Sequence, residues 1–158
     1  MKLMGFFMII TSGVIFGFSK YMEMEKLVKV LECYENLLNE IKIGISYSLD
    51  DIHLILAESD NLVAVRIRKS ASFPYNLDAA WKETSESFFR KSKEEDFIER
   101  FIEEFSKTDM EASQIITDNC INKVHLKYVS EKEKLLKKGK IYIIYSVFIS
   151  FAIAMLLI

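Results

Sequence analysis

Two long uncharged segments, one at each end, constrain the fold of this chain more than any other feature of its sequence. Residues 3–19 and 141–158 contain no Asp, Glu, Lys or Arg, and all 23 acidic residues of the 158-residue chain lie between them. As a helix, the C-terminal segment would be about 27 Å long, close to the roughly 30 Å hydrocarbon core of a bilayer. The sequence therefore predicts two terminal transmembrane helices, residues 1–19 and 141–158, around a charged domain of residues 20–140.

Each apolar segment also has an alternative interpretation. The C-terminal segment could be a buried core helix, but its apolar residues surround the helix and its early tyrosines are typical of the headgroup level. The N-terminal segment could be a cleaved signal peptide, yet the bulky Phe16 and Phe18 stand where small residues would precede the cleavage site. We therefore favour two uncleaved spans.

The lysines predict the orientation of the chain in a cell membrane. Five of them precede the C-terminal segment. On the far side of the two apolar segments, towards the chain ends, Lys2 is the only basic side chain. Lysine-rich flanks stay in the cytoplasm, so the middle domain should be cytoplasmic and both termini should lie across the membrane. Cys33 and Cys120 would then face a reducing compartment, which disfavours a disulfide. We assign four residues to the membrane interface: Lys137, Lys138, Lys140 and Tyr142.

Apolar residues in the middle domain recur at helical spacing. Between Met24 and Ile45 they follow alternating steps of three and four residues, which predicts one long helix that continues from the N-terminal span. Residues 61–71 fit either a helix or a strand, because β-branched residues alternate there. The predicted fold class is all-α, an antiparallel helical bundle between two terminal transmembrane helices.

Capping residues predict where the shorter helices begin. Three capping boxes occur, and Asn76, which follows Pro74, predicts a further helix start. The second box opens a helix with Phe97, Phe101 and Phe105 on one face, and the third opens a helix without a breaker before Gly139. The boxes are Ser48-x-x-Asp51, Ser92-x-x-Glu95 and Thr108-x-x-Glu111.

Residues that carry catalysis or bind metals are sparse. His53 and His125 lie far apart, the two cysteines cannot form a zinc site alone, and no Gly-rich phosphate loop occurs. The net charge of −2 gives no basic field for nucleic acid. We therefore expect a protein that is not an enzyme, has no cofactor and binds no nucleic acid.

Two charged clusters keep alternatives open. The carboxylates of Glu94–Glu104 could serve a membrane-bound enzyme or metal-dependent hydrolase, although carboxylates early in a helix also complement its dipole. Arg66, Arg68 and Lys69 could contact lipid headgroups or an acidic partner, or form a solvated face. A third possibility is a membrane-tethered regulator of a soluble signalling protein.

Several short motifs follow one another along the chain. They are Leu37-Leu38-Asn39-Glu40-Ile41, Ala80-Trp81, Phe105 with Asp109 and Gln114, and a Lys-rich stretch with Leu135 and Gly139 before the last span. This order resembles the stage III sporulation protein AB family of endospore-forming bacteria. The soluble domain of that family is similar to the cytoplasmic domain of type II secretion platform proteins.

The resemblance implies a mother-cell membrane protein of the secretion-like complex between mother cell and forespore. Its expected partners are the lipid bilayer, a secretion-type ATPase (stage III sporulation protein AA) and other membrane proteins of that complex. Glu40, the charged residue of the first motif, is the predicted partner-binding residue. The alternative for Glu40 is an ion pair with a lysine of a neighbouring helix.

Overall fold

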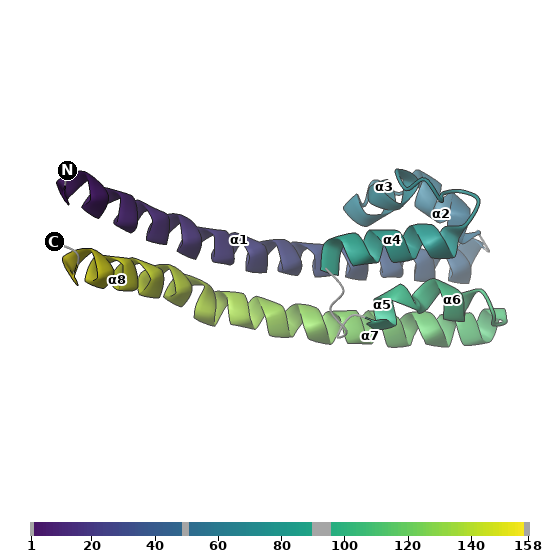
Figure 1. Ribbon diagram of the computed structural model, residues 1–158. Helices are drawn as coiled ribbons and strands as arrows, with labels where there is room; N and C mark the ends of the chain where they lie inside the picture. Colours follow the sequence, from purple (N-terminus) through teal and green to yellow (C-terminus); the bar gives the residue numbers. More distant parts are fainter. Residues whose placement is uncertain (1, 49–50, 90–95, 157–158) are drawn as a thin grey trace. The chain divides into compact units, whose positions relative to one another are not determined.

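The computed structural model describes residues 2–48, 51–89 and 96–156, and every regular element in these ranges is helical (Figure 1). The all-α prediction is therefore confirmed, and the ambiguous segment 61–71 contains a helix. The elements are α1 (Lys2–Ile43), the π-helical η1 (Gly44–Ser48), α2 (Ile52–Glu58), α3 (Leu62–Arg68), α4 (Leu77–Phe89), α5 (Asp96–Glu99), α6 (Phe101–Phe105), α7 (Met110–Lys134), the π-helical η3 (Leu135–Gly139) and α8 (Lys140–Leu156).

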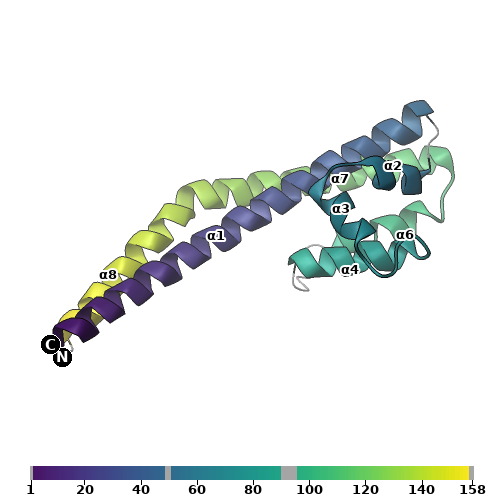
Figure 2. The ribbon, with the colours of Figure 1, turned by 90° about the horizontal axis from the view of Figure 1, so that it is seen from above.

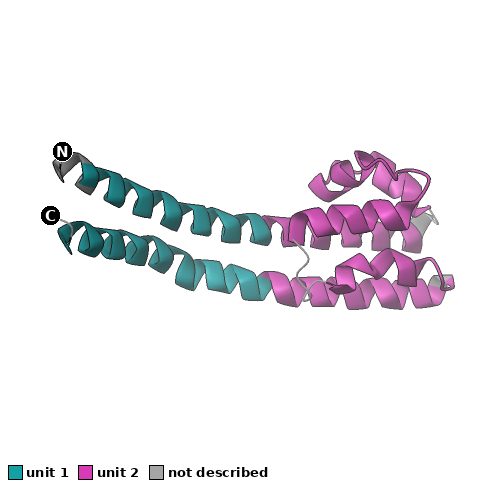
Figure 3. Ribbon diagram, viewed as in Figure 1, with its two compact units in different colours: residues 1–28, 129–158 teal, residues 29–128 magenta. Residues whose placement is uncertain are grey.

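The chain divides into two compact units (Figure 3). Unit 1 consists of Met1–Val28 and Val129–Ile158, and unit 2 consists of Lys29–Tyr128. The predicted division into residues 1–19, 20–140 and 141–158 refers to the membrane and stays a prediction.

The core of unit 2 is built on the predicted heptad positions of α1. Leu31, Tyr34, Leu38 and Ile41 are fully buried, which confirms this part of the pattern. On α7 the buried positions are Ser113, Thr117, Cys120 and Val124, spaced by four, three and four residues. Most of these side chains are small, so the buried positions of α7 differ in character from the large apolar ones of α1.

Polar contacts show the direction of the two helices within unit 2. Nδ1 of His125 lies 2.8 Å from Glu35 Oε1, and Lys42 Nζ lies 2.6 Å from Asp118 Oδ1. Because the residue numbers rise on α1 as they fall on α7, the two stretches run in opposite directions.

Helix α4 supplies the aromatic centre of unit 2 and contacts α3, α5 and α6. The ring of Trp81 is fully buried, 5.7 Å from that of Tyr34 and 5.4 Å from that of Phe101. Its indole Nε1 donates a hydrogen bond to the Ile98 carbonyl at 2.6 Å, while the Tyr34 hydroxyl lies 2.9 Å from Ser85 Oγ. The polar atoms of these large side chains are thus satisfied inside the core.

Two of the predicted helix caps are wrong by one or more residues. Asp51, not Ser48, caps α2 by accepting a hydrogen bond from the His53 amide at 3.1 Å. Likewise, the Asp109 carboxylate accepts from the Ala112 amide at 3.0 Å at the start of α7, in the place predicted for Thr108. In both cases a carboxylate nearer to the helix takes the position.

The other helix starts have different outcomes. Asn76 accepts from the Ala79 amide at 3.0 Å, as expected of a cap for α4. The box at Ser92-x-x-Glu95 lies outside the described residues. The predicted phenylalanine helix is divided by a turn at Arg100 into α5 and α6, and the predicted uninterrupted C-terminal helix passes through the π-helical η3.

Unit 1 pairs the N-terminal part of α1 with α8, and the start of α1 lies beside the end of α8 (Figures 1 and 2). A Cβ atom at Gly13 would lie 1.6 Å from Ser150 Oγ, and one at Gly17 would lie 2.1 Å from Ser146 Oγ. The two glycines are therefore required for this close helix packing, as in small-xxx-small contacts of membrane helices.

One continuous helical stretch among the described residues, Glu111–Leu156, is long and apolar enough to contain a membrane span. It includes α8, where the C-terminal span is predicted. The same search of the described part of the chain does not return the N-terminal segment, so that span stays a prediction.

Candidate functional site

Glu40 lies on α1 with an exposed side chain and contacts the connection between α2 and α3. Its Oε2 accepts a hydrogen bond from Ser59 Oγ at 2.5 Å. The Ser59 hydroxyl in turn accepts from the Asn61 amide at 3.1 Å, and Asn61 Nδ2 donates to the Cys33 carbonyl at 2.8 Å. The partner of Glu40 is therefore a hydroxyl group rather than the lysine of the alternative prediction.

Two further carboxylates lie beside this contact. Glu58 and Asp60 flank Ser59 in the sequence, and both are exposed. We call Glu40, Glu58 and Asp60 the Glu40 surface. Its three negative charges, on α1, at the end of α2 and on the connection that follows, suit a partner that presents lysine or arginine side chains.

The contacts of Ser59 with Glu40 and of Asn61 with Cys33 are not among the contacts predicted from the sequence. The local signal was present, because Asn61 precedes an apolar run and caps α3 by accepting from the Val63 amide at 2.9 Å. The contact with α1 joins residues 19 positions apart in the chain, and no short-range pattern reports such a contact.

One residue of the basic cluster of Arg66, Arg68 and Lys69 makes contacts within the fold. Arg68 Nη1 donates to the Leu56 carbonyl at 3.2 Å and also to the Ala57 carbonyl, both in the last turn of α2. Arginine there stabilises the negative end of the helix dipole. Arg66 and Lys69 are exposed, so within this cluster only these two residues fit the predicted solvated face.

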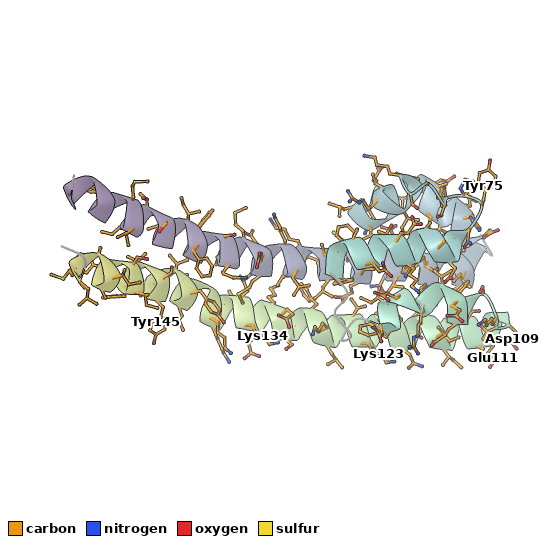
Figure 4. All side chains as sticks on the ribbon, viewed as in Figure 1. Tyr75, Asp109, Glu111, Lys123, Lys134 and Tyr145 are labelled. Atoms are coloured by element: carbon orange, nitrogen blue, oxygen red, sulfur yellow. The ribbon has the colours of Figure 1, made fainter. Side chains whose placement is uncertain are left out.

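The residues assigned to the membrane interface all belong to unit 1. Lys137 donates to Glu133 Oε1, and this hydrogen bond holds the pKa of the Glu133 carboxyl below its usual value. Lys138, Lys140 and Tyr142 are exposed at η3 and the start of α8. Figure 4 shows Tyr145, one helical turn beyond Tyr142, pointing away from α1.

The carboxylates of Glu94–Glu104 do not gather into one site within the described residues. Glu94 and Glu95 lie outside those residues, and Glu99 is half-buried on α5. Glu103 accepts from Lys107 Nζ at 2.7 Å, which lowers the pKa of the Glu103 carboxyl. Across 2–48, 51–89 and 96–156, no three His, Cys, Asp or Glu side chains are placed to hold a metal ion.

The two cysteines differ in their surroundings. Burial raises the pKa of the Cys120 thiol to about 12. The pKa of the half-buried Cys33 thiol is also raised, first by burial and then by the Glu32 carboxylate. Neither thiol is poised as a nucleophile, since the reactive form is the thiolate.

We predict that Cys33 reacts with a maleimide much faster than Cys120 in the folded full-length chain in detergent. Burial holds the pKa of the Cys120 thiol well above pH 8, so little of the reactive thiolate forms, and the buried side chain is also shielded from the reagent. Mass spectrometry of a labelling time course measures both rates, and unfolding in urea should make them similar. Equal rates in the folded protein would contradict the burial of Cys120.

A known protein family matches almost the whole chain. The family described as stage III sporulation protein AB matches residues 2–158. No curated protein and no solved structure is significantly similar to the chain.

Proposed function

Since this chain belongs to the stage III sporulation protein AB family, we propose that it is a membrane-anchored, non-enzymatic platform component of the secretion-like complex that endospore formation requires. It acts in the mother-cell membrane. Its cytoplasmic helical domain docks a secretion-type ATPase, stage III sporulation protein AA, and contacts other membrane proteins of the complex.

The proposed architecture is an antiparallel helical bundle between two membrane spans. The opposite course of α1 and α7 within unit 2 supports the bundle. The apolar α8 supports one span, and the uncharged residues 3–19 support the other. The lysines before α8 support a cytoplasmic domain.

The observation that carries the docking proposal is the Glu40 surface. Glu40 belongs to the motif that carries the family resemblance, and its carboxylate is exposed although it accepts a hydrogen bond. A purely structural acceptor does not need a charge in this place, because a neutral amide oxygen accepts the same bond. The charge is therefore available for a basic side chain of the ATPase.

We predict that Glu40→Gln weakens ATPase binding about fivefold and leaves the melting temperature unchanged. Glutamine keeps an acceptor for Ser59 but removes the charge, and an exposed ion pair contributes up to about 1 kcal/mol. Surface plasmon resonance of the full chain in nanodiscs measures binding, and circular dichroism measures stability.

The matched control is Ser59→Ala, which removes the hydrogen bond and keeps the charge of Glu40. It should lower the melting temperature without a comparable loss of binding. If Glu40→Gln lowers stability and binding is unchanged, Glu40 belongs to the fold alone. If the unaltered chain does not bind the ATPase at all, the docking proposal is wrong.

The topology predicts a specific labelling pattern. Cysteines introduced near either terminus, in a chain whose Cys33 and Cys120 are replaced by serine, should react with an impermeant thiol reagent in intact cells. A cysteine at exposed Asp60 should react only after the membrane is permeabilised. Reaction at position 60 in intact cells would show that the domain is not cytoplasmic.

A further inference from the structure

The lysines that precede α8 differ in whether a carboxylate neutralises them. Lys134 Nζ lies 2.7 Å from Glu131 Oε1, and Lys137 contacts Glu133. Lys138 and Lys140 are exposed and form no ion pair in the part of the chain that the structure describes. Unit 1 therefore carries two uncompensated positive charges at the start of its apolar helix.

The packing of Gly139 places these two charges. Gly139 is buried, and a Cβ atom there would lie 2.9 Å from Cδ2 of the Tyr21 ring. Position 139 thus faces α1, and its neighbours Lys138 and Lys140 diverge from that contact by about a quarter of a turn in opposite directions. Both ammonium groups are consequently directed outward.

The surroundings of these lysines match the boundary between headgroups and acyl chains. After Lys140 the sequence continues with the exposed Ile141 and Tyr142, and no acidic residue occurs from there to the end of α8. Tyr142 is 48% exposed and Tyr145 is 64% exposed, so their hydroxyl groups are available at the surface of α8. Tyrosines of this kind favour the headgroup level.

We infer that Lys138 and Lys140 form a headgroup site in which each lysine, on its own side of the helix, binds the phosphate of an anionic phospholipid, and in which the Tyr142 hydroxyl, one turn beyond Lys138, is an additional donor on that side. Ammonium groups bind phosphate as compact point charges. A zwitterionic headgroup offers the same phosphate beside a positive charge that repels both lysines, so the site selects net-negative lipids. This inference rests on the proposed placement of α8 in the membrane.

Native mass spectrometry of the full chain, delipidated in detergent and titrated with phosphatidylglycerol or phosphatidylcholine, tests the inference. Each lysine near an anionic surface contributes about a fivefold preference, so each lipid bound at the site should be phosphatidylglycerol rather than phosphatidylcholine by about fivefold in affinity. Lys138→Gln combined with Lys140→Gln should bring this ratio close to one. The matched control, Lys134→Gln combined with Lys137→Gln, removes the same charge from lysines that are paired with carboxylates and should change the ratio by less than about 1.5-fold.

The outcomes separate this inference from the proposed function. An equal loss of preference in both double variants, or no preference in the unaltered chain, would overturn the lipid site. Carbonate extraction of cell membranes reports on the placement of α8 independently. A chain that stays in the membrane but does not select lipid contradicts the inference alone, whereas a chain released by carbonate contradicts both.

Discussion

Replacing Trp81 with alanine should destabilise unit 2 by about 3–5 kcal/mol, the usual cost of removing a buried tryptophan. The fully buried ring lies in edge contact with Tyr34 and beside Phe101, and its Nε1 donates to the Ile98 carbonyl. The substitution would open a cavity at the centre of these contacts. It would also leave a buried carbonyl without its donor.

The measurement is urea unfolding of the full chain in mild detergent, followed by circular dichroism. Tyr75→Ala is the matched control, because this aromatic side chain is 95% exposed and its loss should change stability by no more than about 0.5 kcal/mol. If the two variants unfold at the same urea concentration, Trp81 does not hold the core of unit 2.

Replacing Phe101 with alanine should have an effect of similar size, about 3–5 kcal/mol. Phe101 is buried on α6, and its ring lies 5.4 Å from that of Trp81 and 5.7 Å from that of Phe105. A five-residue helix has little intrinsic stability, so α6 depends on this anchor. We expect α5 and α6 to detach before the rest of unit 2 unfolds.

Hydrogen–deuterium exchange measures that local detachment as faster exchange in residues 96–105. The half-buried Phe97 provides the control, since Phe97→Ala should cost clearly less than Phe101→Ala. Because Phe101 and Trp81 are in contact, the double variant should be less unstable than the sum of the single effects. Strict additivity would show that the two rings do not share one core.

The sequence predicts the core of unit 2 well on one helix and poorly on the other. On α1, large apolar residues recur at heptad spacing, and Leu31, Leu38 and Ile41 are buried as expected. On α7, the buried positions include Ser113 and Thr117, whose polar side chains hide the pattern from a search for apolar residues. Whether such a small polar side chain is buried depends on what packs around it in the fold, and the pattern within one helix does not contain that information.

Helix caps depend on residues close together in the sequence, whereas the contacts of the candidate site depend on residues that are far apart in it. Asn76 was predicted correctly because a cap depends on residues within one helical turn. Asp51 was missed as the cap of α2 because Ser48 offered an equally plausible local pattern. The link from Glu40 to Ser59 depends on how α2 and α3 pack against α1, so the sequence indicated the residue but not its contact.

The burial of Trp81 has a practical consequence, because it is the only tryptophan in the chain. All tryptophan fluorescence therefore arises from one dry position, and its emission should be blue-shifted and resistant to quenching by iodide. Since the indole donates a hydrogen bond to Ile98 of α5 and lies beside the tilted ring of Phe101 of α6, any event that loosens these short helices should shift the emission to longer wavelength. The protein thus carries an intrinsic optical reporter with which loosening of α5 and α6 can be followed in real time without an added dye.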